Sequence, residues 1–190
     1  APDGVTGDSF GRSISINEDG VVTVGAHLDD DMGDQSGSAY VFTPNDDDSY
    51  IGLDGTIYET TETPPVIYSY GEFHEINGEG AASKLVAPDG DKDDHFGVSV
   101  QMNDHGVVVV GTPGDDDKGT RAGAVYVYTP DGDGYVETKL VASDGAGADI
   151  FGDQSVINNS GVIAVSAHYD DDMGDQSGSI YVFTPTEGGG

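Results

Sequence analysis

Three adjacent aspartates with a glycine two residues later occur at residues 29–31, 115–117 and 170–172. Calcium takes roughly six to eight oxygen ligands, and glycine allows the tight backbone turn that such a loop needs. Adjacent carboxylates repel one another, so the folded loop must separate them or a bound cation must neutralise them. We therefore predict calcium as a ligand of at least one loop, with a hydrated turn as the alternative. The predicted metal ligands are Asp29, Asp30, Asp31, Asp34, Asp115, Asp116, Asp117, Asp170, Asp171, Asp172 and Asp175.

A second group of aspartates precedes the phenylalanines Phe10, Phe96 and Phe151. One aspartate lies two residues before each phenylalanine, and the middle copy adds three more with alternating spacing. Aspartate also commonly accepts hydrogen bonds from backbone amides in turns, so this second group is the weaker metal candidate. Its members are Asp8, Asp89, Asp91, Asp93, Asp94 and Asp149.

Other reactive side chains give weaker signals. His27 and His168 stand beside two of the triplets, and we interpret them as surface residues rather than metal ligands. Asn158 begins an Asn-Asn-Ser sequon in a turn and is a predicted glycosylation site. No Ser-His-Asp arrangement recurs, and nothing selects one carboxylate pair as a glycosidase would require. We therefore predict that the chain is not an enzyme.

The chain of 190 residues carries 36 Asp+Glu against 6 Lys+Arg, for a formal net charge of −30. Such a charge repels nucleic acid and anionic membrane surfaces, so neither is an expected partner. No apolar run approaches ~18 residues, so we expect no membrane insertion. Carboxylates at this density are typical of halophilic proteins, whose folds need salt to screen the repulsion.

Three segments align without gaps, at residues 8–44, 94–130 and 149–185. We accordingly divide one continuous repeat domain into four parts. The first and second repeats are separated by an insertion rich in Tyr, Thr and Pro, which is either a contact surface or an outer loop. The parts are a first repeat at 1–44, the insertion at 45–83, a second repeat at 84–130 and a third at 131–190.

Each repeat has the pattern of β-strands, as the second one illustrates. Residues 98–102 form a short apolar segment, and a turn ending in glycine leads to the continuous apolar run at 107–112, typical of a buried strand. A third strand at 124–130 follows the acidic loop and ends at proline, and residues 134–142 alternate as a solvent-side fourth strand. We predict an all-β fold of antiparallel four-stranded blades of β-propeller type, forming an incomplete ring.

The phenylalanine of each copy is followed by glycine, and Val-Gly-Ala at 24–26 or Val-Gly-Thr-Pro at 110–113 comes later in the copy. This pattern resembles the FG-GAP repeat of integrin α-like β-propellers, in its microbial secreted form. The resemblance implies an extracellular or cell-surface location and an adhesive, ligand-binding or structural role. The first and third copies depart from the pattern with Val-Gly-Ala-His and Val-Ser-Ala-His, and the calcium loop of the integrin type is not intact.

From these features we expect an extracellular structural or adhesive protein that calcium influences. A carbohydrate- or ligand-binding module is the alternative, and a hydrolase the third possibility. A Lys-Leu-Val segment precedes the second and third copies, but none precedes the first copy and none follows the third. Unpaired sheet edges are therefore expected. We expect other copies of the chain or further repeats of the same polypeptide to complete them by strand addition, in a filament or ring, with glycans or surface proteins as further partners.

Overall fold

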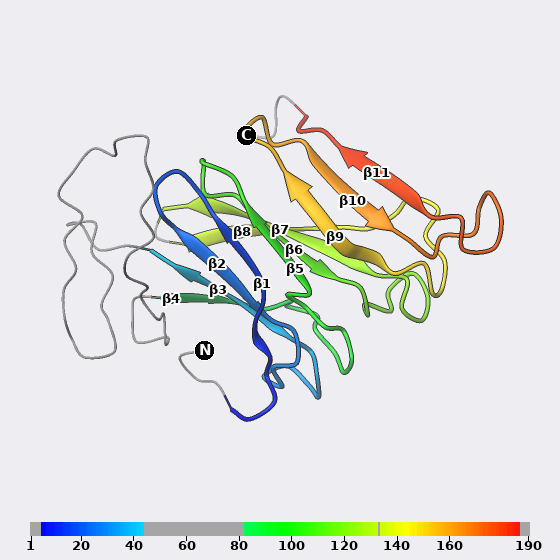
Figure 1. Ribbon diagram of the computed structural model, residues 1–190, viewed down its shortest axis with the longest axis horizontal. Helices are drawn as coiled ribbons and strands as arrows, with labels where there is room; N and C mark the ends of the chain where they lie inside the picture. Colours follow the sequence, from blue (N-terminus) through cyan, green and yellow to red (C-terminus); the bar gives the residue numbers. More distant parts are fainter. Residues whose placement is uncertain (1–4, 44–81, 133, 187–190) are drawn as a thin grey trace, which may run out of the picture.

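The computed structural model describes residues 5–43, 82–132 and 134–186, and these form three antiparallel sheets that lie side by side without closing into a ring (Figure 1). The first sheet has the order β1 (Phe10–Ile16), β2 (Val22–Ala26), β3 (Ser38–Phe42) and β4 (Ala82–Leu85). The second has β5 (Ser99–Met102), β6 (Val108–Thr112), β7 (Ala124–Asp131) and β8 (Gly134–Leu140). The third has β9 (Phe151–Ile157), β10 (Ile163–Ala167) and β11 (Ser179–Phe183).

The predicted fold class is confirmed, because the described residues contain strands in blade-like sheets and no helix. The turn between the first two strands of each sheet is built in the same way. In the second sheet the side chain of Asn103 accepts hydrogen bonds from the amides of His105 and Val107, both 3.0 Å long, and Gly106 takes a φ of 74°. A local side-chain hydrogen bond and a glycine therefore set each hairpin.

The fourth strand of a sheet comes from the sequence that follows its acidic loop and third strand. Residue Tyr40 of β3 pairs with Lys84 of β4, and Tyr126 of β7 pairs with Lys139 of β8. The sheets are thus offset from the sequence repeats, since residues 84–85 complete the first sheet and residues 134–140 the second. The insertion predicted at 45–83 lies almost entirely outside the described residues.

Each sheet has two apolar faces. We call the face that carries Tyr40, Tyr126 or Tyr181 the front face and the other the back face. The back face of the first sheet, with Ala39 and Val41, packs on the front face of the second sheet. The back face of the second sheet packs in the same way on the front face of the third. Strand β6 lies between two neighbours, and its three valines Val108, Val109 and Val110 are fully buried, as the continuous apolar run predicts.

Two glycines on strands allow neighbouring sheets to approach each other closely. A Cβ atom at Gly25 would lie 2.0 Å from the carbonyl oxygen of Gly97, and one at Gly111 would lie 1.9 Å from that of Gly152. The same two carbonyls accept hydrogen bonds from Ser13, at 2.8 Å, and from Ser99, at 3.3 Å. A side chain at either glycine would push the sheets apart.

We predict that Gly111→Ala lowers the free energy of unfolding by about 2–3 kcal/mol, because the added methyl group has to displace the backbone of the third sheet. Urea denaturation in molar salt measures the loss. Gly134→Ala on β8 is the matched control, since its Cβ would meet no atom nearer than 3.9 Å. Equal stabilities of the two variants would contradict the role of this contact.

Candidate functional site

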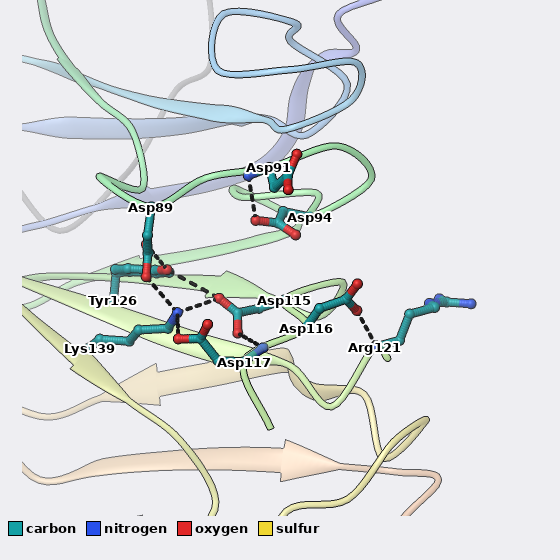
Figure 2. A network of polar contacts seen from close by, with 9 residues as sticks. All are labelled: Asp89, Asp91, Asp94, Asp115, Asp116, Asp117, Arg121, Tyr126 and Lys139. Carbon is teal, nitrogen blue, oxygen red and sulfur yellow. Dashed lines mark hydrogen bonds and ion pairs between the residues drawn. The ribbon is translucent and has the colours of Figure 1, made fainter. Parts of the chain in front are cut away.

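Of the three adjacent aspartates of an acidic loop, the first and third point to the same lysine and the second points away from it, as Figure 2 shows for the second sheet. The buried Asp115 accepts a hydrogen bond from the Tyr126 hydroxyl, at 3.2 Å, and one from the amide of Asp117, at 3.1 Å. Asp116 accepts a hydrogen bond from the amide of Arg121, at 2.6 Å, on the other side of the loop. The fold therefore separates Asp116 from the other two carboxylates of the triplet, which lie close together.

A lysine lies at the centre of this acidic cluster (Figure 2). The Lys139 Nζ atom lies 2.8 Å from Asp89, 2.6 Å from Asp115 and 2.6 Å from Asp117, and 5.2 Å from the centre of the Tyr126 ring. These three carboxylates are the described group close enough to share one metal ion, with oxygen atoms within 4.8 Å of one another. The ammonium group takes the place where such an ion would bind, so calcium has to displace Lys139 to enter this cluster.

The ionisation of the cluster follows from its hydrogen bonds. Burial alone would lower the pKa of Lys139, but hydrogen bonds to Asp115, Asp117 and Asp89 outweigh it and raise this pKa. Burial alone would raise the pKa of Asp89, but hydrogen bonds from Lys139 and Tyr126 outweigh it and lower this pKa. Burial and the neighbouring carboxylate of Asp89 raise the pKa of Tyr126, which stays a hydrogen-bond donor. Lys139 and Asp89 are thus held in their charged forms.

The first sheet repeats the arrangement. The Tyr40 hydroxyl donates to the buried Asp29, at 3.0 Å, and Lys84 Nζ lies 3.1 Å from Asp29 and also pairs with Asp31. Asp30 accepts a hydrogen bond from the amide of Gln35, at 2.8 Å. The lysine and the tyrosine were missed in the sequence interpretation, although Lys-Leu recurs ten residues before Asp94 and Asp149.

The third sheet differs, because no lysine lies at its acidic cluster among the described residues. The Tyr181 hydroxyl donates to Asp144 and to Asp170, both at 2.8 Å. The charges of Asp170 and Asp144 raise the pKa of Asp172. Asp171 and Asp175 are exposed. This cluster has the carboxylates of the other two without their countercharge.

The remaining predicted ligands have other partners. Asp34 and Asp93 pair with Lys92, and Asp91 accepts a hydrogen bond from the Lys92 amide, at 2.7 Å. The three aspartates before the phenylalanines are buried. Each closes a turn by accepting a hydrogen bond from the backbone amide three residues earlier. These bonds are Val5 to Asp8 at 2.7 Å, Asp91 to Asp94 at 2.8 Å and Ala146 to Asp149 at 2.6 Å.

Asn158, the predicted glycosylation site, is exposed at the turn between β9 and β10. Its side-chain oxygen accepts hydrogen bonds from the amides of Ser160 and Val162, at 2.9 and 3.0 Å. The side chain thus sets the hairpin, and its modification stays a prediction.

Comparison with known families gives one match. A family model described as FG-GAP repeat matches residues 1–42, 80–128 and 136–183, which is more than half of the chain. No curated protein matches the sequence. The second and third matched segments begin near β4 and β8, and each contains one acidic loop.

We predict that Lys139→Gln lowers the free energy of unfolding by about 2 kcal/mol, because Asp89, Asp115 and Asp117 lose their shared countercharge. Millimolar calcium should raise the melting temperature of this variant more than that of the parent, since the three carboxylates become available. Thermal melts with calcium and with chelator, at matched ionic strength, measure both effects. Lys118→Gln removes the same charge from an exposed side chain and is the control. Equal changes in the two variants would refute the role of Lys139.

A second prediction concerns pH. Burial raises the pKa of Asp94 to about 6, and the charges of Asp115 and Asp116 add to the rise against the opposing hydrogen bond from the Asp91 amide. Because the unfolded pKa is about 4, protonated Asp94 stabilises the fold fully below pH ~4, and this stabilisation is lost as the pH rises through about 6.

Asp94→Asn should therefore flatten the dependence of stability on pH between about 4 and 7 and be more stable than the parent above that range. Denaturant melts at a series of pH values in molar salt measure this. Asp19→Asn, in an exposed turn, controls for the change in net charge. An unchanged pH profile in Asp94→Asn would show that this carboxyl group does not contribute.

Proposed function

The chain belongs to the FG-GAP repeat family, and on this basis we propose that it is an extracellular structural or adhesive module that assembles with further subunits and is strengthened by calcium. The chain is a β-propeller-type repeat module. FG-GAP repeats are typical of extracellular or surface proteins, and no described helix has the length and apolarity to cross a membrane. The family is generally non-enzymatic, and we propose no catalytic role for this chain.

The end faces of the three-sheet stack support assembly. On the front face of the first sheet, Ile14 is 68% exposed, whereas Val100 at the same position of the second sheet is 1% exposed. On the back face of the third sheet, Ile180 is 68% exposed, whereas Val125 at the same position is buried. The chain buries this pair of faces against each other twice within itself, so packing of the same kind between two copies would cover both exposed isoleucines.

The single observation that carries the proposal is the edge of β11. In the first and second sheets the third strand pairs with a fourth strand that carries Lys-Leu. In the second sheet Lys139 lies opposite Tyr126 and Leu140 lies opposite Val125, and the first sheet has the same register. Among the described residues β11 pairs with β10 alone. The incoming strand therefore carries a Lys-Leu pair, with the lysine opposite Tyr181 and the leucine opposite Ile180.

Neither Lys-Leu segment of the sequence is available to be that strand. Lys84 and Lys139 are the lysines followed by leucine in the sequence, and they already serve the first and second sheets. A further repeat or another subunit supplies the strand by main-chain pairing along β11, as exposed sheet edges do in other recognition systems. The acidic cluster at Tyr181 adds charge complementarity to the lysine.

Calcium has a physical role in such an assembly. Copies with a net charge of −30 repel one another, and divalent cations reduce this repulsion more strongly than monovalent ions do. At the third sheet no described lysine competes with an ion, although the carboxylates of Asp89, Asp115 and Asp117 in the second sheet are the described group that lies close enough together to share one. Asp170, Asp171, Asp172 and Asp175 would hold the ion, which supplies the countercharge that lysine supplies to the other two sheets.

The experiment replaces residues 186–190 by a copy of residues 131–142, which gives the third sheet its own Lys-Leu strand. We predict a rise in melting temperature of about 5 °C and loss of binding of a labelled peptide with the sequence of residues 134–142. The parent chain binds the peptide, and calcium raises its melting temperature more than that of the grafted chain. Calorimetry and fluorescence anisotropy measure these effects.

The matched control is the same graft with glutamine in place of its lysine. It should stabilise the chain less, because Asp144, Asp170 and Asp172 keep their repulsion. A parent chain that does not bind the peptide, together with a graft that does not raise the melting temperature, would refute strand addition at β11.

A further inference from the structure

A hollow of about 420 Å³ opens where the three sheets meet at the beginnings of β1, β5 and β9. Its lining comes from all three sheets, with Arg12 from the first, Arg121 from the second and His168 from the third among the contributors. It is separate from the acidic clusters described above, none of whose aspartates lines it. The hollow therefore has its own chemistry.

The charges of the hollow are the reverse of those of the chain. It is lined by both arginines of the sequence and by His27, His95 and His168, three of the five histidines. Of the 36 acidic residues in the sequence, the lining contains one, Asp153. A chain with so few basic groups thus gathers them around one opening.

His95 Nε2 lies 3.3 Å from the side-chain oxygen of Gln35 and His168 Nδ1 lies 3.6 Å from Asp153, but the other basic groups of the hollow have fewer partners. Lys84, Lys92 and Lys139 pair with carboxylates. By contrast, neither arginine side chain forms a hydrogen bond or ion pair with the described part of the chain, where aspartate is abundant. The Nδ1 atom of His27 is buried and has no hydrogen-bond partner among the described residues. Because the protein covers this atom, the hydrogen-bonding capacity that the hollow offers to a ligand comes from the two arginines.

Part of the lining of the hollow is apolar. Leu28, Val98 and Ile150 line it, and Pro113 and Tyr169 add further apolar surface. Binding sites for small molecules commonly combine such a lining with a few polar groups that fix orientation. A guanidinium group binds a carboxylate or sulfate through parallel hydrogen bonds.

We propose that this hollow binds a small organic anion. Arg12 and Arg121 hold its carboxylate or sulfate group, and the apolar part of the ligand contacts the apolar residues of the lining. The site should prefer ligands with a single negative charge. The net charge of −30 on the chain repels polyanions at a distance, whereas the two arginines attract one anionic group at contact. The histidines donate or accept hydrogen bonds to the remainder of the ligand.

The ionisation of the histidines agrees with this assignment. Burial lowers the pKa of His27, and the nearby His95 and Arg12 lower it further. Burial lowers the pKa of His95 as well, with Asp93 opposing and Arg121 adding to the effect. The His27 and His95 rings lie with centroids 6.0 Å apart. Both histidines therefore sense the positive charge that a bound anion would neutralise.

The histidine rings provide the readout. In ¹H–¹³C NMR spectra at fixed pH and ionic strength, glucuronate and methyl sulfate should each shift the ring signals of His27, His95 and His168 saturably. His105 lies in an exposed turn outside the hollow and should not shift. Glucose, which has a similar body to glucuronate and no charge, should have no effect. Uniform shifts of all histidines, or equal responses to glucose and glucuronate, would overturn the proposal.

Charge-removing variants locate the site. Arg12→Gln and Arg121→Gln should each weaken binding of glucuronate, and the double variant should weaken it at least tenfold. Lys118→Gln removes the same charge from an exposed loop position outside the hollow and should leave binding unchanged. Melting temperatures check that the variants are folded. If the double variant does not fold, the two single variants test the proposal. Binding of equal strength in the parent and the arginine variants would overturn the proposal.

Discussion

The structure depends on the contact of one backbone carbonyl with a glycine of the neighbouring sheet. The carbonyl oxygens of Gly97 and Gly152 lie where a Cβ atom of Gly25 or Gly111 would be, and a serine hydroxyl binds each carbonyl. This contact sets the distance between sheets, and that distance decides which side chains fill the space between them. The phenylalanines Phe96 and Phe151 are fully buried as a result. The starts of β1, β5 and β9 also come together there, around the hollow with the two arginines.

The back face of the third sheet does not carry this contact in the same form. Ser166 takes the place of Gly25 and Gly111, and Gln154 takes the place of Ser13 and Ser99. The Ser166 hydroxyl lies over β9 and accepts a hydrogen bond from the Gln154 amide, at 3.2 Å. A sheet docked on this face has to sit farther away than the sheets within the chain do, because the serine side chain occupies the position of the carbonyl. An interface between copies therefore differs in geometry from the two internal interfaces.

Few positive charges serve a very acidic chain, and the fold places them at specific points. Lys84 and Lys139 each neutralise an acidic cluster below a tyrosine, and Lys92 joins two loops. Exposed ion pairs contribute little to stability, but the Lys139 side chain is 18% exposed and its partner Asp115 is buried, so the loss of Lys139 leaves one carboxylate that water screens poorly. The same need for a countercharge explains why the third cluster, with no described lysine, is the one where an incoming lysine or a calcium ion would have the greatest effect.

The sequence by itself determined the strands, the turns and the threefold repeat, because these depend on neighbours in the chain. Alternating apolar residues, an Asn that bonds amides two and four residues later, and a closing glycine act within one hairpin. Only the tertiary structure decided what the aspartates do. Lys84 reaches Asp29 across 55 residues of sequence, and Lys139 reaches Asp89 across 50. The spacing of three carboxylates in the sequence suggested one shared ion, but the fold directs the first and third carboxylates to a lysine and the second to a backbone amide. The grouping of Arg12 with Arg121 likewise required the packing of one sheet on the next, since no local pattern links residues on separate sheets.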